Sequence, residues 1–196
     1  MKNVSLLFVA ALYAAPVCVA AVSRETVNGE YVITVNAGDA DETLTSADIA
    51  ALGTTVNLVK RGEGRLIIES DLAGWVGEAR IEAGYLQVRH QGALGYTGKD
   101  AASGGLVVKD GGTLEIDGTV IKGSTDAVLS CKKYTLEGTG VGGTAGAVYL
   151  FGNNSYWYGS GTVVFTGDTT FKADKNDRQL DMRNGLFNFN GHTIMR

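Results

Sequence analysis

Short apolar runs recur along most of the chain, and in each of them apolar residues alternate with other residues after a glycine. The repeated unit is glycine, any residue, apolar, any residue, apolar, so both apolar side chains point to one face of a strand. It occurs at Gly64-Leu66-Ile68, Gly84-Leu86-Val88, Gly104-Leu106-Val108, Gly112-Leu114-Ile116, Gly146-Val148-Leu150, Gly161-Val163-Phe165 and Gly185-Phe187-Phe189. The pattern predicts many short strands, each with one buried face, joined by tight turns that use glycine.

The glycines that open these units are spaced at the length of a solenoid coil. Gly64 and Gly84 are 20 residues apart, Gly84 and Gly112 are 28 apart, and Gly161 and Gly185 are 24 apart. Such a unit cannot bury its apolar face alone, but it can do so when one coil stacks on the next. We therefore expect an all-β fold, a right-handed parallel β-helix. A β-sandwich is the second choice, because Asn-Gly hairpins do not regularly join the runs.

The first 21 residues are typical of a secretory signal peptide. Lys2 supplies a positive start, residues 4–15 form an apolar segment, and residues 18–21 offer small side chains for cleavage. The apolar segment is interrupted by Pro16 and is shorter than the roughly 20 residues that span a bilayer. We therefore expect export rather than stable insertion of this chain in a membrane.

A short helix is predicted before the repeated units. Ser46 is the expected N-cap, Asp48 lies in the first turn, Ile49 and Leu52 share one face, and Gly53 ends the helix. We assign residues 22–57 to an N-terminal cap region and residues 58–196 to the β-helix.

Composition and charge narrow the function further. The 28 glycines with a single proline favour turns between strands, and the formal net charge of −4 argues against a nucleic-acid partner. Cys18 lies in the predicted signal peptide, which leaves Cys131 alone in the rest of the chain. An internal disulfide or a cysteine-based zinc site is therefore not expected.

Several motifs follow one another between residues 58 and 95. They are K-x-G-x-G-x-L (Lys60, Gly62, Gly64, Leu66), an aromatic-x-G centre (Trp75, Gly77), A-G-x-L-x-V (residues 83–88) and a closing G-A-L-G (residues 92–95). Residues 161–194 add T-G-D-T-T-F (166–171) and N-G-H-T-I (190–194). Together they resemble the autotransporter-associated β-strand repeat of bacterial passenger proteins. The resemblance implies a parallel β-helix displayed on, or released from, the surface of a Gram-negative bacterium, and it transfers no catalytic residue.

The chain departs from that family at its C-terminal end. Autotransporters carry a membrane barrel of many alternating strands there, whereas this chain ends at Met195-Arg196 without one. The last expected strand, 193–195, also has no visible capping segment. We therefore expect a truncated reading frame, a fragment of a longer passenger without independent function, or a partner that stacks end to end on the open C-terminal edge.

Two segments have residue patterns that also occur in ligand-binding or catalytic sites. Residues 138–143 have the spacing of the dinucleotide motif G-x-G-x-x-G, but the strand–helix frame is missing, so turn glycines are the better interpretation. Four carboxylates, Asp168, Asp174, Asp177 and Asp181, suit calcium or polysaccharide cleavage. Basic residues at 172, 175, 178 and 183 are interleaved with them, which favours a solvated loop. We expect no catalytic residue, metal site or cofactor.

An aromatic group gives the best candidate for ligand binding. Phe151 and the run Tyr156, Trp157 and Tyr158 lie beside amide side chains at 153 and 154, a combination that suits stacking on sugars. The alternative is that part of this set fills the core of the β-helix. His90 and His192 are far apart in sequence, and neither indicates a metal ligand or a catalytic base.

The sequence therefore predicts a non-enzymatic β-helix, secreted or displayed on the bacterial cell surface as a passenger-like stalk or adhesin segment. Its expected partners are surface glycans and the surfaces of host or neighbouring cells. The alternative is a β-helix that binds or degrades carbohydrate. Glycan retention without cleavage indicates binding, and released oligosaccharide indicates degradation.

Overall fold

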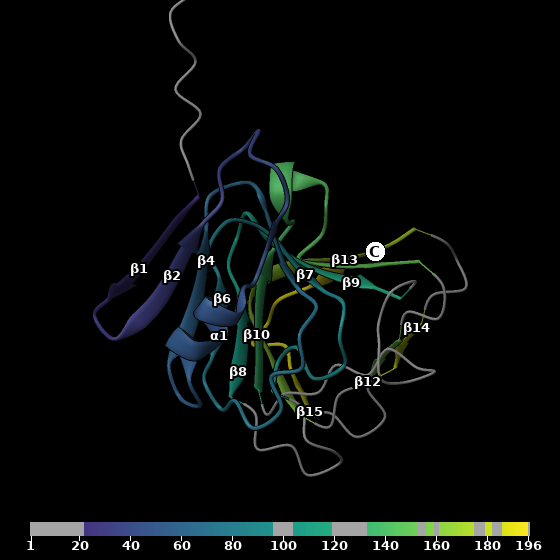
Figure 1. Ribbon diagram of the computed structural model, residues 1–196. Coiled ribbons are helices and arrows are strands. Elements are labelled where there is room, and N and C mark those ends of the chain that lie inside the picture. The colour runs from purple at the N-terminus through teal and green to yellow at the C-terminus, as the bar shows by residue number, and fades with distance from the viewer. Residues whose placement is uncertain are drawn as a thin grey trace, which may run out of the picture.

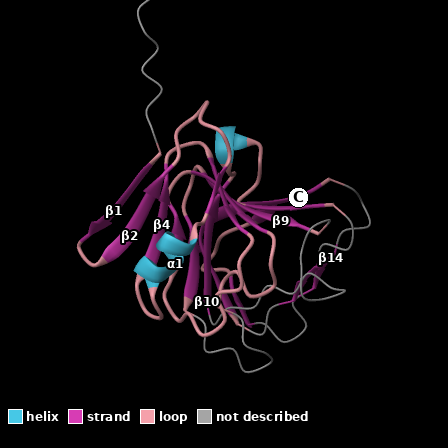
Figure 2. Ribbon diagram, in the orientation of Figure 1, coloured by secondary structure: helices cyan, strands magenta, loops and turns pink. Residues whose placement is uncertain are grey.

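The computed structural model describes residues 22–95, 104–118, 133–152, 156–158, 161–174, 179–181 and 186–195, with only the backbone described at 156–158 and 179–181. The predicted signal peptide, residues 1–21, lies outside this part of the chain, as does Cys131. Strands dominate the described residues, and the two helical segments are short (Figure 2).

The strands stack side by side in the order that a coiled chain produces (Figure 1). One series, here called the first sheet, contains β1 (Ser23–Val27), β2 (Glu30–Thr34), β4 (Asn57–Arg61), β6 (Ala79–Ile81), β8 (Gly105–Val108), β10 (Lys133–Gly138), the start of β13 (Thr162–Ala173) and β15 (Leu186–Asn188). The second sheet contains β3 (Glu42–Thr43), β5 (Arg65–Ile68), β7 (Gly84–Val88), β9 (Gly112–Asp117), β11 (Val148–Phe151) and the end of β13. The last strand, β16 (Ile194–Met195), pairs with β13 at the corner where β13 passes between the sheets. A third side carries the pair β12 (Tyr156–Tyr158) and β14 (Gln179–Asp181).

All described strand pairs are parallel except β1 with β2. The chain moves from the first sheet to the second and back before it reaches the neighbouring strand, which gives a β-solenoid of about five turns. The predicted parallel β-helix is therefore confirmed. The β-sandwich is wrong, because a sandwich requires antiparallel hairpins throughout both layers.

The repeated glycine-led units form two inward-facing columns. In the second sheet, Leu66 pairs with Leu86, Leu86 with Leu114 and Leu114 with Val148, and each of these side chains is at most 1% exposed. The coil lengths agree with the glycine spacing in the sequence, since Leu66 and Leu86 are 20 residues apart and Leu86 and Leu114 are 28 apart. Coils of unequal length therefore keep one register, because the extra residues lie in the connections between strands.

The helix α1 (Ser46–Leu52) lies in the first coil, between β3 and β4. Its N-cap is Thr45 and not Ser46. The Thr45 side chain accepts a hydrogen bond from the Asp48 backbone, and the Asp48 side chain accepts one from the Thr45 backbone, which completes a capping box. Gly53 ends the helix as expected, and Leu52 is buried. The region 22–57 holds this helix and the β1–β2 pair, and it also contributes β2 and β3 to the stacked coils.

Glycine at the corners between the two sheets lets successive coils approach closely. Gly84 has a φ of +71°, and a Cβ built there would meet backbone of the preceding corner, with the Gly64 carbonyl oxygen at 2.6 Å. At Gly111, φ is +84°, but no atom lies within 4 Å of a built Cβ. Positive φ is common to both positions, whereas close packing is found only at Gly84. Substitutions at the two positions therefore distinguish the cost of backbone strain from the cost of close packing.

We expect Gly84→Ala to lower the free energy of unfolding by about 2 kcal/mol more than Gly111→Ala does. Both variants place alanine at positive φ, but only Gly84→Ala must also push two stacked corners apart. Urea unfolding of the two variants and the wild type measures the difference. Equal losses would show that the corners can move apart at no cost.

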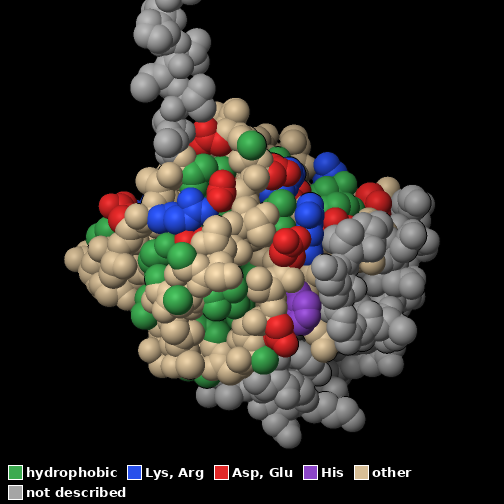
Figure 3. All heavy atoms as spheres, in the orientation of Figure 1, with side chains coloured by type: hydrophobic (Ala, Val, Ile, Leu, Met, Phe, Trp, Pro, Cys, Tyr) green, Lys and Arg blue, Asp and Glu red, His purple; other side chains and the backbone are tan. Residues whose placement is uncertain are grey.

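Ion pairs run across the coils on the outer face of the first sheet. Arg61 pairs with Glu82 at 2.6 Å, Arg80 pairs with Glu30 two coils away, and Lys109 pairs with Glu137 at 3.1 Å. Figure 3 shows acidic and basic side chains intermingled on the face drawn there. Partly exposed pairs of this kind contribute roughly 0.2–1 kcal/mol each, so they supplement the stacking of the coils and do not replace it.

Candidate functional site

The aromatic residues predicted from the sequence fall on two different sheets. Phe151 ends β11 and is half-buried, whereas Tyr156, Trp157 and Tyr158 form β12, whose side chains lie outside the described part of the structure. Phe151 stacks instead on Tyr149, with ring centroids 5.2 Å apart and planes at 24°. The structure therefore describes an aromatic pair in place of the predicted group.

Tyr149 was missed in the sequence, although it lies two residues before Phe151 on the same face of a strand. The Lys172 ammonium lies 5.5 Å from the centroid of its ring. Burial and the negative charges of Asp174 and Glu115 raise the pKa of Tyr149. The result is a half-buried aromatic surface with a cation above it, on the outer face of the second sheet.

The predicted carboxylates are not brought together where the structure describes them. Asp168 lies at the corner of β13, where its Oδ1 accepts a hydrogen bond from the Thr193 backbone at 2.9 Å. Asp174 follows the other end of that strand and accepts from the Gly152 backbone at 3.2 Å. Six extended residues separate two Cα atoms by roughly 20 Å. Asp177 lies outside the described residues, and only the backbone of Asp181 is described.

The glycine-rich stretch at 138–143 forms a turn between β10 and β11. Residues Val141–Gly143 make one short 3-10 segment, and a Cβ built at Gly140 would meet the backbone of Gly146. A nucleotide-binding motif requires a longer helix that begins at these glycines. The interpretation as turn glycines is therefore confirmed.

The two histidines each lie near one aspartate. His90 accepts a hydrogen bond from the Gly92 backbone at 3.0 Å, and its Nδ1 is 3.9 Å from Asp71. The Nδ1 atom of His192 is 3.8 Å from Asp168. Within the described residues, no three His, Cys, Asp or Glu side chains are grouped as a metal ion would require.

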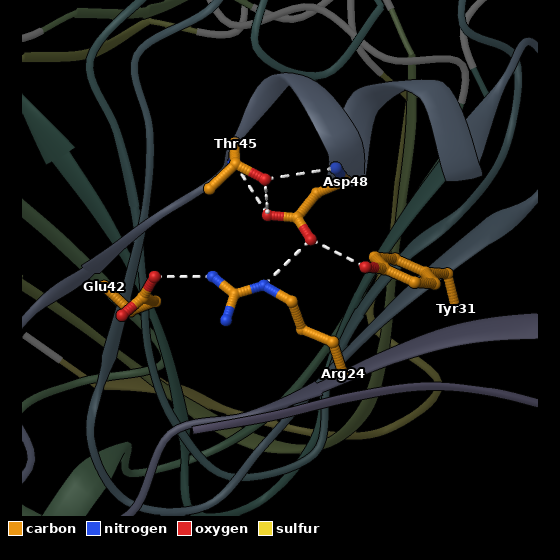
Figure 4. Close-up of polar contacts among 5 residues, drawn as sticks. All are labelled: Arg24, Tyr31, Glu42, Thr45 and Asp48. Atoms are coloured by element: carbon orange, nitrogen blue, oxygen red, sulfur yellow. Dashed lines mark hydrogen bonds and ion pairs between the residues drawn. The ribbon is translucent and has the colours of Figure 1, made fainter. Parts of the chain in front are cut away.

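A polar cluster, missing from the sequence-based predictions, closes the first coil (Figure 4). The carboxylate of Asp48 is fully buried and accepts hydrogen bonds from the Tyr31 hydroxyl at 2.6 Å and from Arg24 at 2.9 Å. Its second oxygen accepts from the Thr45 backbone at 2.7 Å and from the Thr45 hydroxyl at 2.8 Å. Arg24 also binds Glu42 at 2.5 Å. The cluster joins β1, β2, β3 and α1.

The cluster shifts the pKa values of its members. Burial alone would raise the pKa of Asp48, but the hydrogen bonds from Tyr31 and Thr45 and the charge of Arg24 lower it below its usual value. Burial and the hydrogen bond to Asp48 raise the pKa of Tyr31 to about 12. Asp48 is therefore held as a carboxylate that orders its neighbours.

We expect Asp48→Asn to lower the free energy of unfolding by about 2–4 kcal/mol near pH 7. The amide nitrogen would face hydrogen-bond donors, and Arg24 would lose the negative charge that pairs with it. The Asp48 pKa is lowered in the folded state, so the loss is complete above the unfolded pKa near 3.8 and shrinks as the pH falls below it. Urea unfolding from about pH 7 to about pH 3 tests this. Asp39→Asn is the control, since the partly exposed Asp39 accepts a single backbone hydrogen bond at 2.8 Å. A pH-independent loss would contradict the expectation.

A lysine replaces an apolar residue in the inner column of the first sheet. Lys60 pairs in register with Ile33 and Ile81, and all three side chains are 0% exposed. Its ammonium donates to the carbonyl oxygens of Arg61 and Gly62 at 2.7 Å and of Ala83 at 3.2 Å. The lysine thus binds the corner backbone of two successive coils. Burial lowers the pKa of Lys60 to about 8.

We expect the stability of the wild type relative to Lys60→Met to rise between about pH 8 and about pH 10.5. In this window the unfolded chain binds a proton at residue 60 that the folded chain does not, so higher pH favours folding. The rise is on the order of 3 kcal/mol. Urea unfolding of both proteins across this range measures it, and parallel profiles would show that the buried ammonium keeps its ordinary pKa.

A second polar network joins four successive coils on the outer face of the second sheet. Arg65 forms two hydrogen bonds with the nearly buried Glu115, at 2.7 and 3.2 Å, and it also pairs with Asp41 at 3.0 Å. The Arg65 guanidinium lies 4.9 Å from the ring centroid of Tyr85, and Gln87 donates to Glu115 at 3.2 Å. Directly bonded residues in it are up to 50 positions apart, so local sequence patterns gave no signal for it.

Phe187 and Phe189 of the C-terminal coil continue the inner column of the first sheet, whereas Leu186 and Met195 pair with the outward-facing Thr162 and Thr170. Phe187 pairs in register with the buried Val163, and Phe189 stacks on the buried Phe165 with centroids 5.2 Å apart. The exposed large hydrophobic side chains of this coil are Leu186 (72%), Phe187 (40%), Phe189 (45%), Ile194 (39%) and Met195 (41%). In the described residues, β15 and β16 each pair with β13.

No protein-family model matches this chain, and no curated protein or solved structure matches it either. In the described part of the chain, no helix has the length and apolar character needed to cross a membrane. The proposed function therefore depends on the residues and their geometry.

Proposed function

We propose that this protein is a non-enzymatic β-helix that is secreted or displayed on the surface of a Gram-negative bacterium, as a passenger-like stalk or adhesin segment. The main support is the constant register of the core through coils of different length. Leu66, Leu86, Leu114 and Val148 remain aligned although the intervening coils differ by several residues. A stalk requires this property, because its length depends on stacking while the connections are free to vary.

The polar clusters support the same role. The carboxylates of Asp48 and Glu115 are held by several donors each; Asp48 joins elements of the first coil, and Glu115 joins strands of different coils. Groups that are already paired in this way stabilise the stack of coils. The export part of the proposal depends on the signal-like residues 1–21 and on the resemblance to passenger repeats.

The export proposal is tested by expressing the full chain in a Gram-negative host. We expect the protein to leave the cytoplasm with its first 20 or 21 residues removed. Leu7→Arg, which places a charge in the apolar segment, should leave the uncleaved chain in the cytoplasm. Ala37→Arg, on an exposed turn, is the control and should be exported normally. Cell fractionation and intact mass measure both results, and an uncleaved cytoplasmic wild type would contradict export.

Carbohydrate binding is the second candidate, because Tyr149 and Phe151 form a half-buried aromatic pair with Lys172 above one ring. Aromatic faces of this kind stack on sugar rings. Incubation of the exported protein with a panel of glycans separates the candidates. Retention that Tyr149→Ala abolishes would favour a lectin-like adhesin, and released oligosaccharide would contradict the non-enzymatic proposal.

A further inference from the structure

The strand β1 is attached to the β-solenoid differently from the other described strands. It pairs antiparallel with β2, and Figure 1 shows the two strands side by side. A turn of two residues joins them, Asn28 with a φ of +52° and Gly29 with a φ of +79°. Positive φ at both positions is the geometry that a tight hairpin requires. The pairing of β1 with β2 is therefore a local contact, made between residues that are close in sequence.

Little apolar surface holds β1 in place. None of its five residues is buried, whereas Tyr31, Val32 and Ile33 of the neighbouring β2 are at most 8% exposed. Val22, directly before β1, is only partly buried against the core. The strand β2 pairs with β4 over five residues on its other side. It therefore keeps its place in the first coil when β1 is removed from it.

The side chain of Arg24 fastens β1 to the first coil (Figure 4). Its Nε donates to the fully buried Asp48 carboxylate at 2.9 Å, and a terminal nitrogen donates to Glu42 at 2.5 Å. Asp48 belongs to α1 and Glu42 to β3. These bonds join residues 24 and 18 positions apart, so they supply the long-range attachment that a hairpin lacks. A charged hydrogen bond to a buried carboxylate is stronger than an exposed ion pair.

We propose that β1 is a strap that opens and closes while the coils remain folded, and that Arg24 is its latch. When the strap opens, the backbone groups of β2 that pair with β1 become exposed to solvent. A free strand edge of this kind pairs with strands of other chains. The closed strap therefore protects this edge, and the strength of the latch sets how often the edge is exposed. This inference does not depend on the proposed export or stalk function.

The carboxylate of Asp48 stays satisfied when the strap opens. It accepts hydrogen bonds from the Tyr31 hydroxyl at 2.6 Å, from the Thr45 backbone at 2.7 Å and from the Thr45 hydroxyl at 2.8 Å. None of these donors belongs to β1. Opening therefore avoids the cost of a buried charge without any partner. It also leaves the stacked apolar columns intact, so it requires less free energy than unfolding of the whole chain.

The test is native-state hydrogen exchange of the purified full chain, followed by NMR at low urea concentrations. The core reporter is the amide of Leu114, which donates to the Ala147 carbonyl at 2.9 Å. In the wild type, the β1 amides that pair with β2 should have protection factors at least about tenfold lower than that of Leu114. Their protection should also depend less on urea, because opening of the strap exposes little surface.

Two variants separate the strap from the coils. Arg24→Ala should lower the protection of the β1 amides at least about tenfold, because the closed strap loses both bonds of the latch. Ile81→Val is the matched control, since Ile81 lies in the core at 0% exposure. It should lower the protection of Leu114 about fivefold and leave that of β1 unchanged, because the core remains packed when only the strap opens.

Three results would overturn the proposal. They are wild-type β1 amides with the protection and urea dependence of Leu114, equal losses for β1 and Leu114 in Ile81→Val, or wild-type protection of β1 in Arg24→Ala. Thermal unfolding monitors the fold of each variant.

Should Arg24→Ala fail to fold, Gly29→Ala decides, because it strains the closed turn at a φ of +79° and a built Cβ meets no atom within 4 Å. The protection of β1 should then fall about fivefold, and an unchanged value would contradict the proposal.

Discussion

Backbone hydrogen bonding between coils that share one register is the constraint on which the other features of this fold depend. A strand alternates its side chains, so a slip of one residue would turn the buried column formed by Leu66, Leu86 and Leu114 to the solvent. The corners hold the register, because Gly84 lies so close to the preceding corner that a Cβ would collide with its backbone. Coil length can therefore vary between the strands while the position of each corner cannot.

Two buried ionisable groups of opposite charge depend on this register. Lys60 occupies an inward position between Ile33 and Ile81, and its ammonium compensates for the loss of water only by binding corner carbonyl groups of its own coil and the next. Asp48 lies at the first coil, where donors from three elements surround its carboxylate. Burial penalises both charges, but each one is satisfied only when adjacent segments are in register. They therefore add specificity to a stack that apolar columns alone would define less strictly.

The period-two pattern after glycine predicted β5, β7, β8, β9, β11, β15 and the start of β13, together with the parallel stacking, but β6 and β10 were not among the predicted units. It also gave the coil lengths, because the corner glycines repeat with the coil. The N-cap was misplaced by one residue, since Thr45 and Ser46 are equivalent by type and only the backbone distinguishes them. The cluster around Asp48 and the contact of Arg65 with Glu115 join residues from 17 to 50 positions apart. No local pattern encodes such contacts, so they require the fold to be known first.

The strand pairing differs between the two ends of the described stack. At the N-terminal end, the antiparallel strand β1 covers β2, and Arg24 ties it to the buried carboxylate of Asp48. At the C-terminal end, β15 and β16 continue the register of β13, and Phe187 extends the inner column. A parallel stack has no internal signal that ends it, because each added coil offers the same edge as the previous one. A change in strand direction, as at β1, covers that edge, because the antiparallel strand occupies the hydrogen-bonding groups of β2.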